Sequence, residues 1–405
     1  ESDVCSADLI GIVTLFVILS YYCVVGGWVL KYVQIYAAGA HFGAGPGAYA
    51  DYFSTFSARP VEPLLWGLGF LVLCIVVVVR GVSQGIEKVS KVLMPLLFLL
   101  LAGLVVYSVT RPGAGEGLRF LFGIDPARLS GDTLVGALGQ AFFSLSVGMG
   151  IMVTYGSYVP KSENLAKSAG WICALDTLVA VMAALAIVPV VMITQGEEGL
   201  GMGGGFAFIS LPAMFAELPG GRFFGMAFFA LLFLAALTSA ISILESLVAF
   251  LTEEFHLSRA RAAIGLSVPM ALLSAGYSLS QSAGRGINLP WFDFKNGLQM
   301  LPMNAVMEKF TDNLMIPLGA LCFCLFVGWV WGTKAAGQEI AGGHGLRRMQ
   351  KPWAFAVRFL APLVIVVILY FTLGMGEGLS EQKKRVPLYG PRFFAGILAH
   401  RVSAR

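Results

Sequence analysis

The carboxylate of Asp176 lies within an apolar stretch, ICALDTLVAVMAAL, where a charge without a partner is costly. An ionised carboxylate at the centre of a membrane helix costs at least about 2.5 kcal/mol, so such an acid is a candidate functional group. Hydroxyl groups interrupt two more apolar stretches, with Ser144 and Ser146 in GQAFFSLSVGMG and Thr238 and Ser239 in LAALTSAISILE. Hydroxyl, carbonyl and carboxylate oxygens are ligands for hard cations. These residue types indicate a cation site if the fold brings them together.

Each hydroxyl also has a purely structural interpretation, which the sequence leaves open. Serine and threonine in membrane helices commonly bond the carbonyl four residues earlier, or allow close helix packing. Tyr22, in the apolar stretch ILSYYCVVGGWVL, can likewise be a packing residue. Glu245 is a weaker functional candidate than Asp176 because it lies nearer the expected cytoplasmic end of its stretch.

The composition places these residues in a membrane. The chain has 405 residues, of which 57% are hydrophobic and 12% are charged, whereas soluble domains are about 25% charged. Apolar runs of about 18 residues or more recur, and each can cross a hydrocarbon core of about 30 Å. The net charge of +4 is small and dispersed, which argues against a nucleic-acid partner. We therefore expect an all-α polytopic membrane protein.

Neither the cysteines nor the histidines favour a disulfide framework or a metal centre. Five of the six cysteines, all except Cys5, lie in apolar stretches, where free cysteine behaves as a small buried hydrophobic residue. The four histidines are isolated from one another and from cysteine pairs. Because no histidine joins a nucleophile or a second acid in these stretches, an intramembrane enzyme is the least favoured class.

Nine segments are predicted to span the membrane, and the loops between them give an orientation. The links rich in Lys and Arg are short and are expected in the cytoplasm, whereas the alternate links are longer and poorer in these residues. The basic tail then falls outside, against this rule. The basic links lie near 81–91, 159–167, 253–261 and 333–352. The predicted spans are roughly 8–32, 62–80, 89–110, 133–158, 167–194, 223–252, 259–280, 310–332 and 353–375.

This orientation places the polar groups at one depth. With a rise of about 1.5 Å per helical residue, each lies roughly 15–22 Å from the membrane face at which its helix begins. Helices that enter from opposite sides thus carry their polar groups to the bilayer midplane. A buried ligand site requires such a convergence.

The segment SLSVGMG, residues 144–150, interrupts its span at the same depth. Glycine in a helix interior costs about 1 kcal/mol, and backbone groups freed in hydrocarbon must find other partners. We predict an unwound hinge between two half-helices, with a plain packing kink as the alternative. Freed carbonyls can coordinate a cation, and a half-helix N-terminus can face an anionic group. Glycines also bracket a short apolar segment at 203–221, which predicts a re-entrant external loop.

The chain resembles the neurotransmitter:sodium symporter family, specifically its bacterial amino-acid branch. The resemblance rests on the stretches around Tyr22, Ser144 and Thr238, together with RGVSQGIEKVSKVLMP and GGGFAFISLPAMF. It implies an inverted-repeat fold with broken helices in a bacterial inner membrane. The family pattern begins two helices earlier, so we expect the nine spans to be its helices three to eleven, with the first two lacking.

The resemblance also implies individual roles. Tyr22 would hold the substrate carboxylate and Phe143 would close over the substrate as an aromatic lid. Glu308 would be the acidic partner of an extracellular gate, with Asp312 as an alternative. The substrate pocket would further contain Ile18, Ser146, Met149 and Ile243. Sodium would bind at two sites, one with Ser144 and Asp176, and the other with Ala235 (through its carbonyl), Thr238 and Ser239.

A chloride site found in animal members of the family is altered in this chain. Gln140 and Ser144 are kept, but Asp176 replaces an Asn and Ala180 replaces a Ser. A second anion about 4 Å from a carboxylate would be repelled by roughly 4 kcal/mol at an effective dielectric of about 20. The resemblance thus predicts chloride-independent transport. Whether Asp176 also takes up a proton after sodium leaves, or only ligates sodium, stays open.

These observations predict sodium-coupled symport of neutral apolar amino acids by alternating access. The expected partners are the amino acid, sodium as the coupling ion and the lipid bilayer, with no cofactor and no metal beyond sodium. Residues 1–375 are expected to form one transmembrane domain, followed by a basic tail at 376–405. The alternative is a truncated membrane fragment or scaffold that does not transport.

Overall fold

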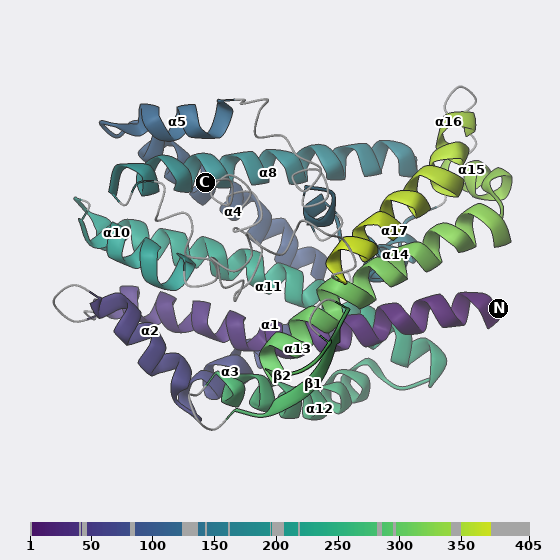
Figure 1. Cartoon of the computed structure of the whole chain (residues 1–405), viewed down its shortest axis with the longest axis horizontal. Coiled ribbons are helices and arrows are strands. Elements are labelled where there is room, and N and C mark those ends of the chain that lie inside the picture. The colour runs from purple at the N-terminus through teal and green to yellow at the C-terminus, as the bar shows by residue number, and fades with distance from the viewer. Residues whose placement is uncertain are drawn as a thin grey trace.

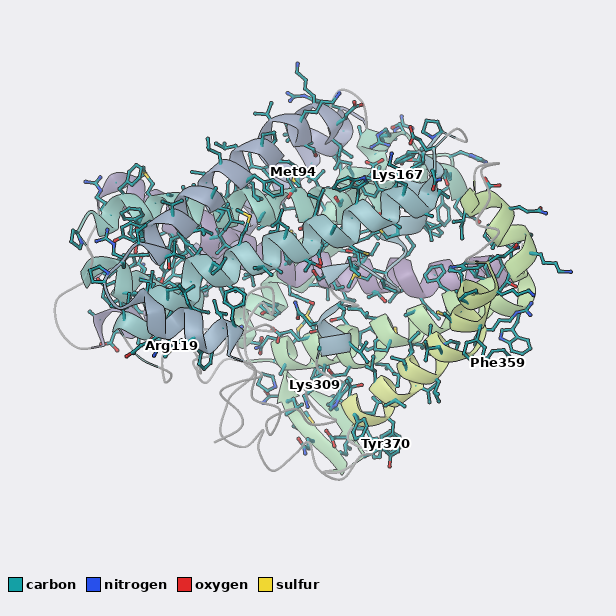
Figure 2. All side chains as sticks on the ribbon, turned by 90° about the horizontal axis from the view of Figure 1, so that it is seen from above. Met94, Arg119, Lys167, Lys309, Phe359 and Tyr370 are labelled. Carbon is teal, nitrogen blue, oxygen red and sulfur yellow. The ribbon has the colours of Figure 1, made fainter. Side chains whose placement is uncertain are left out.

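The computed structural model is a bundle of long helices. Three of them, α1, α8 and α11, run along the long axis of the molecule (Figure 1). Seen from above, η7 (Ala356–Leu360), which carries Phe359, and α17 (Ala361–Thr372), which carries Tyr370, lie at the edge of the bundle (Figure 2). The structure describes residues 2–39, 42, 47–81, 86–123, 137–141, 144–160, 163–194, 196, 206–217, 219–281, 286–294, 297–341 and 350–373.

The helices and strands alternate between long spans and short connecting elements. In the first half they are α1 (Ser2–Ala38), α2 (Ala48–Ala58), α3 (Glu62–Val79), α4 (Lys88–Val109), α5 (Ala114–Phe122), α7 (Ile151–Ser157), α8 (Leu165–Thr194) and α10 (Leu211–Glu217). In the second half they are α11 (Gly221–Glu254), α12 (Arg259–Ser280), β1 (Asn288–Asp293), β2 (Gly297–Pro302), α13 (Met303–Lys309), α14 (Ile316–Leu325), α15 (Thr333–Ala341), α16 (Gln350–Phe355) and α17 (Ala361–Thr372). Four π-helical segments join them, at Phe206–Ser210 (η4), Phe310–Met315 (η5), Phe326–Val330 (η6) and Ala356–Leu360 (η7).

Eight helices within the described ranges are long and apolar enough to cross a membrane, and they correspond to eight of the nine predicted spans. The remaining span, 133–158, is not one continuous helix, because turns at 145–150 separate residue 144 from α7. The predicted hinge is therefore confirmed. The predicted limits of the first span, 8–32, are wrong, since α1 extends from Ser2 to Ala38. The apolar pattern predicts only the part of the helix that lies in the membrane. The helix itself extends beyond that part at both ends.

Several links predicted as loops contain structure. The link after α12 contains a hairpin in which Asn288 pairs with Pro302 and Asp293 pairs with Gly297. The link after α1, which is predicted to be external, contains α2, and the link after η6, which is predicted to be cytoplasmic, contains α15. These elements are short, so their apolar periodicity is too brief to be distinguished from loop sequence. The tail at 376–405 lies outside the described residues.

Helix α1 is the centre of the bundle and packs against α3, α11, α12 and α14. Its contact with α3 requires glycine, because a Cβ atom at Gly27 would lie 2.3 Å from the backbone nitrogen of Gly67. Small residues at a crossing let helix backbones approach closely, which compensates for the weak hydrophobic drive between helices in lipid. The small-residue contact therefore fixes α1 against α3.

The segment Phe206–Glu217, formed by η4 and α10, packs on the outer part of the bundle. The Tyr32 hydroxyl donates to the Phe208 carbonyl at 2.8 Å. The Phe208 ring contacts the rings of Trp28, Phe53 and Phe229. The prediction of a short apolar segment that does not span is confirmed, since the apolar helical run Ala207–Ala216 is too short to cross a membrane. We call Phe206–Glu217 the outer segment.

Candidate substrate and ion site

A cavity of about 300 Å³ lies where α1, α11, α12 and the broken span meet. This volume is at the lower end of the range of small-molecule sites, about 300–1,000 Å³. Five residues predicted for the substrate pocket line it, and Phe143 lies outside the described residues. Its walls are formed by Ile18, Tyr21, Tyr22, Val25, Ser144, Ser146, Met149, Ile151, Met152, Tyr155, Ser239, Ser242, Ile243, Tyr277, Glu308 and Asp312.

The break in the span forms one wall of this cavity and depends on glycine. Ser146, Gly148 and Gly150 all have positive φ angles, of 54°, 83° and 80°. A Cβ atom at Gly148 would lie 2.5 Å from the carbonyl oxygen of Ile316, so a larger residue would meet both strain and a clash. Non-glycine residues in this conformation cost about 1–3 kcal/mol. The chain therefore leaves the helix at this point and re-enters it at Ile151.

Asp176 faces the broken span. The Ser144 hydroxyl donates to both carboxylate oxygens of Asp176, at 2.7 and 2.9 Å. Asp176 is half-buried on α8. Gln140 lies one helical turn before Ser144, and Ala180 lies one turn after Asp176, and both are partly buried. The two residues predicted for the first sodium site are thus in direct contact.

The hydroxyl groups of Thr238 and Ser239, both predicted for the second sodium site, make different contacts. The Thr238 hydroxyl donates to the carbonyls of Leu234, at 3.1 Å, and Ala235, at 3.0 Å. This is the local helix bonding that the structural interpretation of Thr238 describes. Ser239 instead lines the cavity, where a side-chain hydrogen bond joins it to Tyr22.

At the end of the cavity nearest the predicted external side, which we call the outer end, hydroxyl groups donate hydrogen bonds to two acids. The Tyr277 hydroxyl donates to Glu308 Oε1 at 2.8 Å, and the Tyr277 ring stacks on Tyr21 with centroids 5.7 Å apart. The Tyr21 hydroxyl lies 3.3 Å from Thr311 Oγ1, which donates to Asp312 Oδ1 at 3.2 Å. The sequence pointed to both acids but missed both tyrosines. The neighbouring pair Tyr21–Tyr22 was the available signal for Tyr21.

An ionic cluster lies at the opposite end of the cavity, nearest the predicted cytoplasmic side, which we call the inner end. The Tyr155 hydroxyl donates to Ser242 Oγ at 2.9 Å. Beyond it, Tyr158 donates to Glu245 Oε1 at 2.8 Å, and Arg259 pairs with Glu245 Oε2. Arg259 also donates to a backbone carbonyl at the end of α3. The sequence ranked Glu245 low, yet its side chain is completely buried at the centre of this cluster.

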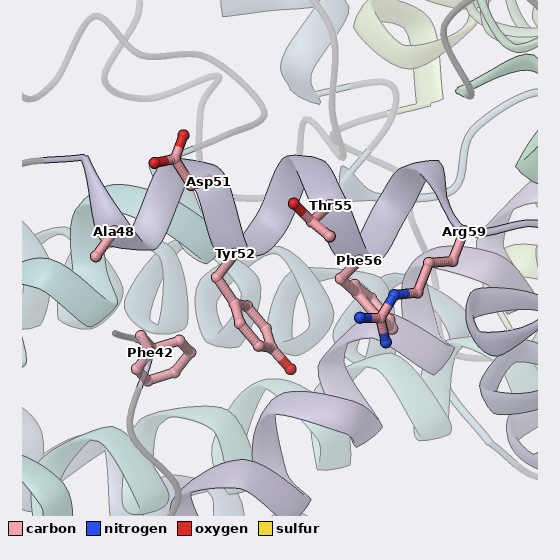
Figure 3. A pocket seen from close by; sticks show the side chains of 7 residues that line it. All are labelled: Phe42, Ala48, Asp51, Tyr52, Thr55, Phe56 and Arg59. Carbon is pink, nitrogen blue, oxygen red and sulfur yellow. The ribbon is translucent and has the colours of Figure 1, made fainter. Parts of the chain in front are cut away.

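A second cavity, of about 380 Å³, lies under α2 and is separate from the central one (Figure 3). Burial raises the pKa of the Tyr52 phenol, and the nearby Glu62 carboxylate acts in the same direction. Arg59 is paired with Glu62 at 2.5 Å. No residue predicted for the substrate or sodium sites lines it. Its walls are Phe42, Ala48, Asp51, Tyr52, Thr55, Phe56 and Arg59.

A bundle of apolar helices around a buried cavity, with one span broken at the cavity wall, is the architecture of a secondary transporter. The chain belongs to the sodium:neurotransmitter symporter family, whose model matches residues 62–397. It is 34% identical over 372 residues to the uncharacterized sodium-dependent transporter YhdH of Bacillus subtilis, covering 90% of this chain and 79% of that protein. It is 32% identical over 370 residues to an uncharacterized sodium-dependent transporter of Haemophilus influenzae, covering 88% and 77%.

The fold also matches a solved transporter. The crystal structure of MhsT in complex with L-phenylalanine superposes with a TM-score of 0.79 and 37% sequence identity, over 91% of this chain and 81% of that chain. The chain is therefore an integral membrane protein of a sodium-dependent transporter family, and its relatives are transporters rather than enzymes.

Proposed function

We propose that the chain performs sodium-coupled symport of neutral apolar amino acids by alternating access around the central cavity. The observation that carries this proposal is the asymmetry of the cavity wall. Ile18, Met149 and Ile243 are buried apolar residues, whereas Tyr22 and Ser239 form a polar end. A zwitterion with an apolar side chain suits this wall, because a charged side chain packed against these apolar residues would lose its water without gaining a partner from them, at a cost of several kcal/mol. The ligand of MhsT, L-phenylalanine, has this chemistry.

The hydroxyl, carbonyl and carboxylate oxygens of the predicted ion sites are ligands that suit sodium as the coupling ion. Ser144 and Asp176 supply a hydroxyl and a carboxylate in contact with each other. Ala235, Thr238 and Ser239 supply a second set of oxygens on α11. Asp176 would balance the positive charge of a bound sodium ion, and Tyr22 would hold the substrate carboxylate. No organic cofactor is required, because the sodium gradient supplies the free energy.

Uptake by proteoliposomes tests this proposal. The chain is reconstituted, and labelled leucine, methionine and phenylalanine are supplied with a sodium or a choline gradient. We expect uptake only with sodium, and competition by apolar amino acids that exceeds competition by glutamate or lysine. Uptake that is indifferent to sodium contradicts the symport, and the reverse order of competitors contradicts the substrate class.

We also propose that transport is independent of chloride, because Asp176 supplies a fixed negative charge beside Ser144. Replacement of chloride by gluconate is then expected to leave uptake unchanged. The double variant Asp176→Asn with Ala180→Ser removes the carboxylate and adds a hydroxyl donor, and it is expected to make uptake respond to chloride. A collapse of unmodified uptake in gluconate would show that Asp176 is not the balancing charge.

A further inference from the structure

Arg358 is a charged residue in an otherwise apolar helical run. It lies in η7, within the apolar span Gln350–Thr372 of the structure, and is partly buried. Its Nε atom donates to the carbonyl of Gly328 at 2.8 Å. Gly328 lies two residues before the end of the span Met303–Val330, which is about 3 Å along a helix. The guanidinium group therefore lies close to the end of the bundle that the loop charges place in the cytoplasm.

A row of exposed aromatic rings, which contact one another, begins beside this guanidinium group. Arg358 Cζ lies 5.9 Å from the Trp329 ring centroid. The Trp329 ring meets Phe359 edge-on at 5.8 Å, and Phe359 is 5.6 Å from Phe355. Trp329 is 60% exposed, and Phe359, at the periphery of the molecule in Figure 2, is 51% exposed. Tryptophan is enriched at the level of lipid headgroups, so this surface faces the interface of the membrane.

The charge around Arg358 is positive. Among the described residues, the structure pairs no carboxylate with Arg358, and Nε is its one hydrogen-bonding atom with a protein acceptor. The exposed Lys351 lies seven residues earlier on α16, and the exposed Lys334 lies on α15, which also carries Glu339. A guanidinium group oriented through Nε presents its two terminal nitrogens as a fork, which matches the oxygens of a phosphate.

We propose that Arg358, framed by Trp329 and Phe359, is a binding site for the phosphate of an anionic phospholipid in the cytoplasmic leaflet. The bond to Gly328 fixes the guanidinium plane, and the aromatic rings lie beside the first part of the acyl chains. Lys351 adds long-range attraction for a lipid of net negative charge. A zwitterionic lipid has the same phosphate, but its own ammonium group opposes this attraction.

The structure offers one competing explanation, in which Arg358 only joins η7 to η6 through the Gly328 carbonyl. This explanation predicts that loss of the guanidinium weakens the fold equally in every lipid. A lipid site predicts a loss that depends on the lipid charge. Measurements with lipids of different charge distinguish the two explanations, and these measurements do not require transport activity.

The experiment measures thermal unfolding of the purified chain in detergent during titration with phosphatidylglycerol, phosphatidylcholine or inorganic phosphate. Native mass spectrometry counts the lipids that stay bound. For the unmodified chain we expect phosphatidylglycerol to raise the transition temperature and to bind at least threefold more tightly than phosphatidylcholine. Inorganic phosphate is expected to have no effect. Equal binding of both lipids, or displacement of phosphatidylglycerol by phosphate, overturns the proposal.

Four variants complete the test. Arg358→Gln is expected to remove the preference for phosphatidylglycerol, and Arg358→Lys to keep part of it. Lys88→Gln, on α4, is the matched control, which removes an exposed positive charge outside the group around Arg358 and is expected to keep the preference. If Arg358→Gln does not fold, the exposed Lys351→Gln is expected to lower the preference about twofold. An unchanged preference in Arg358→Gln, or in Lys351→Gln when that variant is used, overturns the site.

Discussion

The two ends of the central cavity are closed by different chemistry. At the inner end, the buried carboxylate of Glu245 is paired with Arg259 and accepts a hydrogen bond from Tyr158. At the outer end, the acids Glu308 and Asp312 have neutral hydroxyl donors in the described contacts. An ion pair taken out of water costs much more to break than a hydrogen bond from a neutral donor. We infer that, among these contacts, the Glu245–Arg259 ion pair is the most costly in free energy to break.

The largest expected effect comes from removing one half of the inner ion pair. Arg259→Met leaves the carboxylate of Glu245 buried without its cation. Such a change costs about 3–5 kcal/mol in buried pairs, because the remaining charge keeps its desolvation penalty. We expect the free energy of unfolding in detergent, measured by denaturant titration, to fall by that amount.

Two variants control this prediction. Tyr155→Phe removes a neutral hydrogen bond to Ser242 at the same end of the cavity, and is expected to cost about 0.5–1.5 kcal/mol. The double variant Glu245→Gln with Arg259→Met removes both charges and is expected to recover most of the stability. If Tyr155→Phe is as destabilising as Arg259→Met, the charge of the ion pair does not account for the loss.

A smaller effect is expected at the outer end. Tyr277→Phe keeps the ring that stacks on Tyr21 and removes only the hydroxyl that donates to Glu308. A hydrogen bond to a carboxylate contributes about 1.5–3 kcal/mol, so the expected loss lies near the lower value. Thermal unfolding of the two proteins in detergent measures it. Tyr370→Phe, at an exposed position on α17, is the control and is expected to stay within about 0.5 kcal/mol. A loss as large as that of Arg259→Met would remove the proposed difference between the ion pair and this hydrogen bond.

The sequence alone predicted the parts of the site that depend on local chemistry. Serines and glycines within an apolar span predicted the break at 144–150, and Gly148 has the positive φ angle that explains why glycine is needed. The apolar lengths predicted the spans. The resemblance to a known family brought Ile18, Met149 and Ile243 together, and all three line one cavity.

The contacts that join distant helices could not be predicted in this way. Tyr277 and Glu308 are 31 residues apart, with a hairpin between them whose strands are too short to give a pattern. Glu245 and Arg259 each look like a charge near the end of a helix. Their pairing depends on how α12 turns back beside α11. Such contacts follow from the packing of whole helices rather than from local spacing.

The smallest expected effect concerns the outer segment, whose contacts with the bundle include aromatic packing and the hydrogen bond from Tyr32. Tyr32→Phe removes the hydroxyl that donates to the Phe208 carbonyl and keeps a ring that packs against Phe229. Hydrogen bonds inside membrane proteins contribute on average about 0.6 kcal/mol, which corresponds to roughly a threefold change in an equilibrium constant. We expect amide hydrogen exchange in residues 207–216 to become about threefold faster, with exchange in α11 unchanged. Because the aromatic contacts of Phe208 stay in place, Phe208→Ala is expected to accelerate exchange far more than Tyr32→Phe does. If the two variants accelerate exchange equally, the Tyr32 hydrogen bond holds the outer segment as strongly as the packing of Phe208 does.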